Sequence, residues 1–385
     1  MRSRTLIRWV DSAIGHVLDR QRSPSERRGV AVIMSGGIGD AVVFSVLAPR
    51  FLPLARDGEA MTLILRADSS AIGFLYDPRF RIEAIDYKRF LHAPLYRLAI
   101  SRRLYGLGFR LVVSADYHRH ALFDEALVAA CRAPETAAME PRVWGKYQDL
   151  LLRNRRLFGR LFDSGGERRH KALRWTDFAN WLTGARLPPP RLAVEGGQRF
   201  APSVPPVAII HPFASEPKRQ HPLQLYRAVV DALPTGSRIL LTGGPGDLDR
   251  SPEYRPLLDD RRVRYVEDGF ATLMPVLERA TLVVSVNTSL MHLAAVLGIP
   301  TVGVGDAAWV DEIAPYPDAM RPPNFEYVFH AMPCQGCLQV CHLPAEGGRY
   351  PCVARLDADR VMAAVRAALV RGNAEQFRPG PTPAA

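Results

Sequence analysis

The sequence predicts an α/β protein built from two Rossmann-like domains. Short apolar runs recur along the chain, and stretches long enough to form helices separate them. This alternation is typical of parallel sheets covered by helices. Proline-rich segments at residues 187–190 and 200–206 divide the runs into two series. Glycine or polar residues directly follow several runs, which is where open parallel sheets bind their ligands.

An amphipathic helix is expected ahead of the first strand, over residues 5–20. Its apolar residues recur at helical spacing, at Leu6, Val10, Ile14, Val17 and Leu18. The helix could lie on a membrane surface, with Trp9 at the level of the headgroups and arginines against anionic lipid. The alternative, which we favour, is that it packs on its own domain. With the polar linker that follows, it makes residues 1–29 a separate segment.

Residues 30–195 should form the first domain, and a distinctive turn follows its first strand. The turn, Gly36-Gly37-Ile38-Gly39-Asp40, lacks the third glycine of the dinucleotide-binding fingerprint. Asp40 should project into the cleft at the carboxyl end of the strand, or cap the following helix, or do both. The strands expected in this domain are Ala31–Met34, Met61–Leu65, Ile82–Asp86 and Arg110–Ala115.

A polar loop, residues 116–120, follows the fourth expected strand. It begins with Asp116. His118 and Arg119 could meet phosphate or carboxylate groups of an acceptor. The alternative is a polar loop without a binding role.

Residues 205–371 should form the second domain, and residues 372–385 a disordered tail. After one of its strands, Asn287, Thr288 and Ser289 are candidates to cap a helix. A helix N-terminus at a strand end suits a nucleotide diphosphate, because free N–H groups and the helix dipole point at one spot. The alternative is an ordinary strand–helix–strand unit. The strands expected here are Val207–His211, Arg238–Thr242, Arg264–Glu267, Leu282–Val286 and Thr301–Val304.

Four segments together resemble glycosyltransferase family 9, the ADP-heptose:lipopolysaccharide heptosyltransferases and their relatives. They are Ile38-Gly39-Asp40, residues 211–218, residues 241–245, and Asn287-Thr288-Ser289 with His292. The resemblance covers roughly residues 30 to 370. It implies the GT-B architecture, with two Rossmann-like domains facing across a cleft, the first for the acceptor and the second for the nucleotide sugar. One departure is that the family usually has Asp-Thr-Gly at residues 287–289, which bears on the identity of the donor sugar.

The resemblance implies an inverting transfer of a sugar such as heptose from an ADP-linked donor to a lipopolysaccharide or another cell-surface glycan. Asp40 would be the catalytic base for the acceptor hydroxyl. Lys218 and the helix N-terminus would stabilise the leaving diphosphate, and His292 would contact the ligands or be a buried helix residue. The expected donor-binding residues are Lys218, Ser215, Gly243, Asn287, Thr288, Ser289 and His292, and the expected acceptor-binding residues are Gly39, Asp116, His118 and Arg119.

No metal should be required for catalysis, because the chain has no Asp-x-Asp pair at a convincing strand end. Two other functions remain open. One is a non-catalytic protein that keeps the nucleotide cleft and acts as an interaction or regulatory module, which the loss of charge at Asn287 favours. The other is a sugar-nucleotide epimerase of similar architecture.

Four of the five cysteines lie close together in the sequence. In a cytoplasmic protein such a cluster favours a structural zinc site over disulfides, with an iron–sulfur site as a weaker alternative. Free or disulfide-forming thiols are the remaining interpretation. The four residues are Cys334, Cys337, Cys341 and Cys352.

The net charge of +11 calls for an acidic partner. Nucleic acid is not expected, because no nucleic-acid-binding motif is present, so anionic lipid or a phosphorylated glycolipid fits better. Arginine concentrates in residues 1–29 and 153–174, although such runs are usually solvated helix faces. The sequence shows neither a signal peptide nor a membrane-spanning run. We therefore expect a cytoplasmic protein with possible peripheral contact to the inner membrane.

Overall fold

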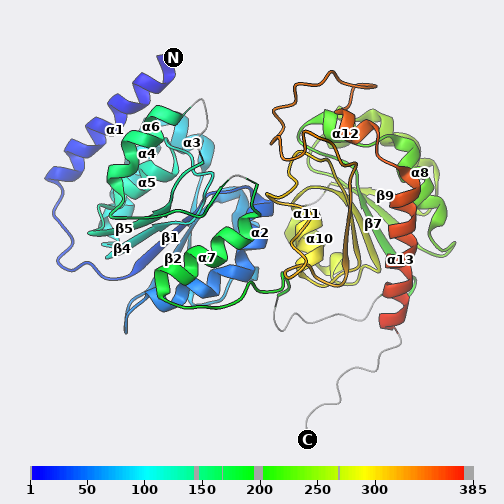
Figure 1. Cartoon of the computed structure of the whole chain (residues 1–385), viewed down its shortest axis with the longest axis horizontal. Coiled ribbons are helices and arrows are strands. Elements are labelled where there is room, and N and C mark those ends of the chain that lie inside the picture. The colour runs from blue at the N-terminus through cyan, green and yellow to red at the C-terminus, as the bar shows by residue number, and fades with distance from the viewer. Residues whose placement is uncertain (1, 143–146, 167, 195–202, 268, 377–385) are drawn as a thin grey trace, which may run out of the picture. The chain divides into compact units, whose positions relative to one another are not determined.

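The computed structural model describes residues 2–142, 147–166, 168–194, 203–267 and 269–376. The chain divides into two compact units, Met1–Pro189 and Pro190–Ala385 (Figure 1). The division falls in the first proline-rich segment. The sequence placed the end of the first domain at residue 195, which lies outside the described residues. The first three residues of the second proline-rich segment, 200–202, lie outside them as well.

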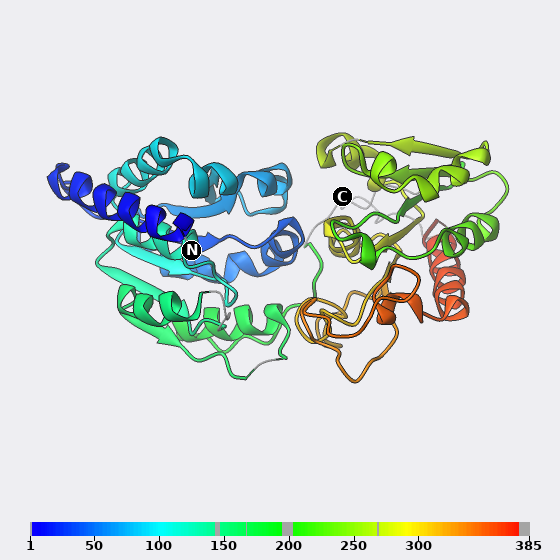
Figure 2. The ribbon, with the colours of Figure 1, turned by 90° about the horizontal axis from the view of Figure 1, so that it is seen from above.

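The first unit contains a six-stranded parallel sheet with the strand order β3-β2-β1-β4-β5-β6. Helices α4 and α5 cover one face and α2 and α7 the other (Figures 1 and 2). The strands are β1 (Val30–Met34), β2 (Met61–Arg66), β3 (Phe80–Ile85), β4 (Leu111–Ser114), β5 (Glu135–Met139) and β6 (Arg160–Phe162). The helices are α1 (Arg2–Arg20), α2 (Ile38–Leu47), α3 (Tyr87–His92), α4 (Pro94–Gly106), α5 (Asp124–Cys131), α6 (Gln148–Asn154) and α7 (Lys171–Thr183), with 3-10 turns η1 (Ala48–Leu54), η2 (Ala67–Leu75) and η3 (Arg155–Leu157).

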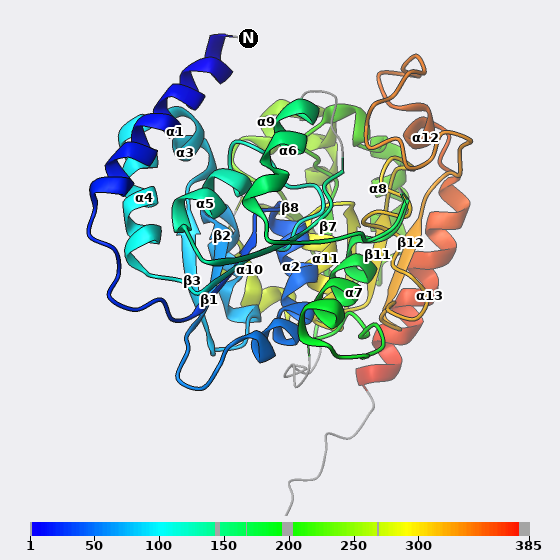
Figure 3. The ribbon, with the colours of Figure 1, turned by 60° about the vertical axis from the view of Figure 1, so that its left-hand side comes forward.

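The second unit contains another six-stranded parallel sheet, with the order β12-β11-β10-β7-β8-β9. Helix α13 packs along β10, β11 and β12 (Figure 3). The strands are β7 (Val207–His211), β8 (Arg238–Thr242), β9 (Val263–Val266), β10 (Leu282–Val286), β11 (Thr301–Val304) and β12 (Phe325–Val328). The helices are α8 (Leu223–Ala232), α9 (Asp247–Arg250), α10 (Phe270–Leu277), α11 (Ser289–Val296), α12 (Pro351–Ala354) and α13 (Ala358–Gln376), with 3-10 turns η4 (Pro217–Arg219) and η5 (Pro252–Asp259).

Both sheets have the doubly wound order 3-2-1-4-5-6, counted along each unit. In each unit the chain reverses its direction of winding between the first and fourth strands, which are β1 and β4 in one and β7 and β10 in the other. Their carboxyl ends are therefore the expected ligand sites. The predicted α/β class, with two Rossmann-like units, is confirmed.

Every strand predicted from the sequence is present, and its ends differ from the predicted ones by at most two residues. Three further strands, β5, β6 and β12, were not predicted. Strand β6 lies inside the arginine-rich segment 153–174, which is therefore not one continuous helix face. The C-terminal helix continues to Gln376, so the prediction of a disordered tail from residue 372 is wrong for its first five residues; residues 377–385 lie outside the described part.

An aromatic cluster fixes α7 against α2 and η1 in the first unit. The ring of Trp175 on α7 lies 5.1 Å from that of Phe44 on α2, in an edge-on arrangement. The Trp175 side chain is buried and its Nε1 donates a hydrogen bond to the backbone oxygen of Ala115, 2.9 Å away. These contacts hold the first turn of α7 beside the carboxyl ends of β1 and β4.

Helix α1 packs on its own unit, as the favoured interpretation expected. Ile14 and Leu18 are buried against Tyr105 of α4, while Trp9 and Val17 are exposed. Turning this stripe toward a membrane would uncover Tyr105 and break the ion pairs of Asp11 with Arg97 and of Asp19 with Arg132. Among the described residues, no helix is long and apolar enough to span a bilayer.

Candidate active site

Asp40 lies in the first turn of α2, directly after β1. The N-cap is Gly37, and Asp40 stands three residues into the helix, so the interpretation of Asp40 as the N-cap itself is wrong. Its Oδ2 accepts a hydrogen bond from the backbone N–H of Gly37 at 3.2 Å. A Cβ on Gly36 would lie 2.6 Å from the Cβ of Asp40. Glycine is therefore needed at position 36 to let the carboxylate fold back over the turn.

A buried lysine joins Asp40 to the polar loop after β4. The Nζ of Lys171, at the start of α7, lies 3.0 Å from Oδ1 of Asp40 and 3.7 Å from Oδ1 of Asp116. The side chains of Lys171, Asp40 and Asp116 are 6%, 15% and 4% exposed. Three elements far apart in the sequence thus contribute one cation and two carboxylates to the carboxyl edge of the sheet. Sequence reasoning did not assign Lys171 a role, and its only signal was that lysine is rare in this arginine-rich chain.

The loop after β4 divides into a part that faces the site and a part that does not. Asp116 accepts a hydrogen bond from the backbone N–H of His118, and the His118 ring lies 3.4 Å from Arg142. Burial lowers the pKa of His118 to about 2, helped by Lys171 and Arg142, so its imidazole is neutral. His118 is thus a neutral hydrogen-bonding group near two cations.

Arg119 is not available to an acceptor, so its predicted role is wrong. Its side chain is fully buried and its Nε lies 2.9 Å from Oε1 of Glu125. The guanidinium also stacks 4.7 Å from the centre of the Phe158 ring. Because the side chains of Arg119 and Glu125 are both buried inside the unit, this ion pair links α5 to the loop after β4 and does not leave Arg119 to bind a ligand.

In the second unit, β10 leads into the N-terminus of α11. Thr288 is the N-cap, and no side chain accepts a cap hydrogen bond. Thr288 and Ser289 are half-buried. Their side chains and the N–H groups of the first helical turn lie where the sequence predicted an anion-binding site, which stays a prediction.

Arg219 braces this turn from the loop after β7. Its Nη2 donates to the backbone oxygen of Asn287 at 3.1 Å, and its Nε lies 2.7 Å from Oδ2 of Asp306, which follows β11. Asn287 itself is 8% exposed. Arg219 is occupied by these partners, whereas the neighbouring Lys218 is exposed and its Nζ lies 5.8 Å from the centre of the Tyr350 ring. Ser215 is exposed on the same loop.

Two other residues of the expected donor site have structural roles. The missing side chain of Gly243 makes room for packing, since a Cβ there would lie 2.8 Å from the Tyr265 hydroxyl and 3.0 Å from Phe213. His292 is 2% exposed, and its Nδ1 lies 2.6 Å from the Tyr316 hydroxyl. The structure thus gives His292 the buried-residue role that the sequence left open.

The four clustered cysteines line one small pocket, together with apolar residues such as Met332 and Leu343. All four are free thiols and half-buried. Within the described ranges, no three His, Cys, Asp or Glu side chains are close enough together to hold a metal ion. The remaining cysteine, Cys131, is buried in the core of the first unit.

Comparison with known proteins places the chain among glycosyltransferases. Residues 148–321 match the family model described as glycosyltransferase family 9 (heptosyltransferase). No curated protein sequence matches the chain. Among solved structures, a family 9 glycosyl transferase from Veillonella parvula has a TM-score of 0.65 at 15% identity, covering 90% of this chain and 98% of its own.

Two Escherichia coli structures are also similar to this chain over most of their length. Heptosyltransferase WaaC with ADP has a TM-score of 0.63 at 18% identity, covering 88% of this chain and 99% of its own. ADP-heptose lps heptosyltransferase II has a TM-score of 0.61 at 14% identity, covering 90% and 99%. At these identities the structural likeness establishes the fold.

Two doubly wound sheets with polar loops at their carboxyl ends give this chain the architecture of the GT-B heptosyltransferase structures. The family match then gives the kind of glycosyltransferase: over residues 148–321 the chain carries the glycosyltransferase family 9 (heptosyltransferase) pattern. The resemblance expected from the motifs is confirmed. The match supports an enzyme that moves heptose, and it favours neither the non-catalytic interaction module nor the epimerase.

Proposed function

We propose that this protein transfers heptose from an ADP-linked donor to a hydroxyl of a lipopolysaccharide core or another cell-surface glycan. The observation that carries the proposal is the buried cluster of Asp40, Lys171 and Asp116 at the carboxyl ends of β1 and β4. A carboxylate held by a lysine and a backbone N–H at such an edge suits a general base.

In the proposed reaction, the acceptor hydroxyl oxygen attacks the anomeric carbon of the donor sugar. The bond between that carbon and the diphosphate oxygen breaks, and the nucleoside diphosphate leaves with the bonding electrons. Asp40 takes the hydroxyl proton as the new bond forms. Attack opposite the leaving group inverts the anomeric configuration.

On the donor side, the N-terminus of α11 would receive the diphosphate, with Thr288 and Ser289 as hydrogen-bonding partners. Lys218 would add a mobile point charge, because its ammonium group has no carboxylate partner among the described residues. Ser215 lies on the loop of Lys218 and would contact the same ligand. Asn287, held by Arg219, would position the turn while lacking the charge usual in the family.

On the acceptor side, Gly39 and His118 would border the hydroxyl that Asp40 deprotonates. Asp116 would hold His118 and Lys171 rather than bind the acceptor directly, because its carboxylate is buried and already occupied. None of these roles requires a metal ion.

We also propose that the four clustered cysteines hold a structural zinc ion. Four thiols lining one pocket supply the donor set that a closed zinc site needs. Binding would draw the sulfur atoms together and stiffen residues 334–352. Peripheral membrane contact belongs to the proposal as well, and it would rest on arginines, because the apolar stripe of α1 is already packed.

Replacing Asp40 by asparagine tests the proposed function. With ADP-heptose and a truncated lipopolysaccharide core, Asp40→Asn should lose transfer by about 10²–10⁴-fold. Binding of ADP, measured by calorimetry, should stay within a few-fold of wild type. Asp57→Asn is the matched control, since this carboxylate is exposed on the same unit. Near-normal turnover by Asp40→Asn would show that Asp40 is not the base.

A further inference from the structure

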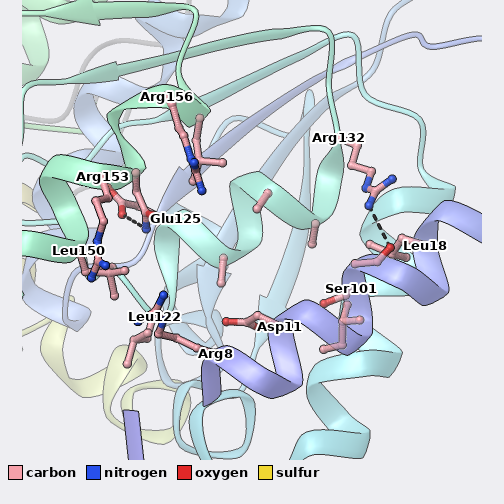
Figure 4. Close-up of a pocket in the computed structure, with 18 residues that line it drawn as sticks. Arg8, Asp11, Leu18, Ser101, Leu122, Glu125, Arg132, Leu150, Arg153 and Arg156 are labelled. Atoms are coloured by element: carbon pink, nitrogen blue, oxygen red, sulfur yellow. Dashed lines mark hydrogen bonds between the residues drawn. The ribbon is translucent and has the colours of Figure 1, made fainter. Parts of the chain in front are cut away.

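A groove with a volume of about 330 Å³ lies on the first unit, away from the carboxyl-edge cluster of Asp40. Helices α1, α5 and α6 line it, with η3 at one end (Figure 4). Its α5 wall consists largely of alanines, at positions 126, 129 and 130, and Gly15 faces them from α1. Small side chains leave space that the arginines around the groove do not fill.

The acidic residues of the groove are already matched by charges inside the unit. Asp11 accepts two hydrogen bonds from Arg97, at 2.5 and 2.9 Å. Glu125 is paired with the buried Arg119 at 2.9 Å. Arg132, on the rim, pairs with Asp19 on α1. These contacts leave no free carboxylate to neutralise further cations in the groove.

Three other arginines line the groove without such a match: Arg8 on α1, Arg153 on α6 and Arg156 on η3 (Figure 4). All three are exposed, and none has a carboxylate partner among the residues that the structure describes. They come from the two arginine-rich segments, 1–29 and 153–174. The fold therefore brings two distant basic segments together at one groove.

We propose that this groove binds the phosphate of an anionic lipid headgroup and so docks the first unit on a membrane surface. Guanidinium groups pair with phosphate oxygens in a bidentate manner. Trp9 and Leu152, each next to a groove arginine in the chain, are 72% and 47% exposed. Exposed aromatic and aliphatic side chains beside arginines are suited to the membrane interface.

The inference deepens the proposed function, because a glycolipid acceptor would lie in the membrane on which the protein docks. It can fail independently, since binding to vesicles requires neither donor nor acceptor. Insertion of the apolar stripe of α1 is not part of it, because Ile14 and Leu18 stay packed on α4.

Co-sedimentation of the full chain with vesicles tests the proposal. Vesicles of phosphatidylcholine mixed with phosphatidylglycerol should bind the protein, and pure phosphatidylcholine should not. The variant Arg153→Gln/Arg156→Gln should bind the mixed vesicles more weakly, by roughly fivefold for each arginine removed. Turnover on a soluble acceptor should not change.

The matched control is Arg227→Gln/Arg264→Gln in the second unit. It removes the same charge from exposed arginines that have no carboxylate partner within the described ranges, and it should bind the vesicles as wild type does. Equal losses in both variants would mean that only net charge matters, and undiminished binding by the groove variant would reject the site. Calorimetry with inorganic phosphate tests whether the groove binds a soluble phosphate instead of a lipid headgroup. If phosphate binding depends on Arg153 and Arg156 and the protein does not bind vesicles, the groove belongs to a soluble ligand and the proposal is overturned.

Discussion

Lys171 is the residue that makes the Asp40 site a connected cluster. It is a cation between two carboxylates in a place where all three side chains are at most 15% exposed. Breaking a buried ion pair by removing one partner typically costs about 3–5 kcal/mol, because the other charge is left uncompensated. A role for Lys171 in catalysis must therefore be separated from its role in stability.

We expect Lys171→Met to lower both the stability of the first unit and the transfer rate, the latter by up to about 10²-fold, because Asp40 loses the group that fixes its Oδ1. The double variant Lys171→Met/Asp116→Asn restores the original charge balance and should recover much of the stability. It should not recover the transfer rate. Thermal unfolding and initial rates measured on both variants check this.

The pattern of the two variants decides the interpretation. If the double variant turns over normally, Lys171 serves only to compensate Asp116. If both variants keep the wild-type rate, the lysine does not position Asp40 at all. Lys88→Met provides a control for the loss of a lysine elsewhere in the same unit.

At the scale of helices and strands, the sequence predicted the elements that carry the site. Strands β1, β7 and β10 are mostly apolar and almost wholly buried, and a polar residue ends or follows each strand. Such runs have a clear signal, so the positions of Asp40 and Thr288 at strand ends followed directly. Two of the three strands that were missed lack this signal: β5 contains few large apolar residues, and β6 is three residues long inside a basic segment.

Side-chain partners across the fold were less predictable. Nothing local to residues 116–120 indicates that Arg119 turns inward to Glu125 while Asp116 lies beside Lys171, because the partners lie on α5 and α7. Similarly, the environment of His292 depends on Tyr316, which lies in a separate loop. Such pairings are set by tertiary packing, which spacing along the chain does not encode.

The cysteine segment, residues 334–352, gives a prediction for one element. Protein purified without added metal should contain about one zinc ion per chain, because four thiolates make a closed site. Elemental analysis measures it. Cys352→Ser should lower the zinc content, while Cys131→Ala, which removes the isolated cysteine, should not. Metal-free protein with residues 334–352 fully ordered would contradict the zinc prediction. Iron in place of zinc would show that the cysteines bind a different metal.

For the molecule as a whole, the buried titratable groups change the stability of the fold in opposite directions as the pH falls. Burial lowers the pKa of His118 to about 2 and that of His221 to about 4, so folding opposes their protonation and acid destabilises the protein through them. Asp124 acts the other way. Its side chain is fully buried at the start of α5, and burial raises its pKa to about 7.

The sign for Asp124 follows from proton linkage. Its folded pKa lies above its value of 3.8 in the unfolded chain, so the folded state holds a proton that the unfolded state has lost between these values. The stabilising contribution is complete below about pH 4 and is lost as the pH rises through about 7.

Asp124→Asn is always neutral and can still accept the hydrogen bond from the backbone N–H of His120. We therefore expect its stability relative to wild type to increase from about pH 5 to about pH 8, by a few kcal/mol at most. Native-state hydrogen exchange of α5 measures the difference within the first unit, and subtracting wild type from variant cancels the contributions of the histidines. A difference that does not change with pH would show that Asp124 stays ionised in the folded protein.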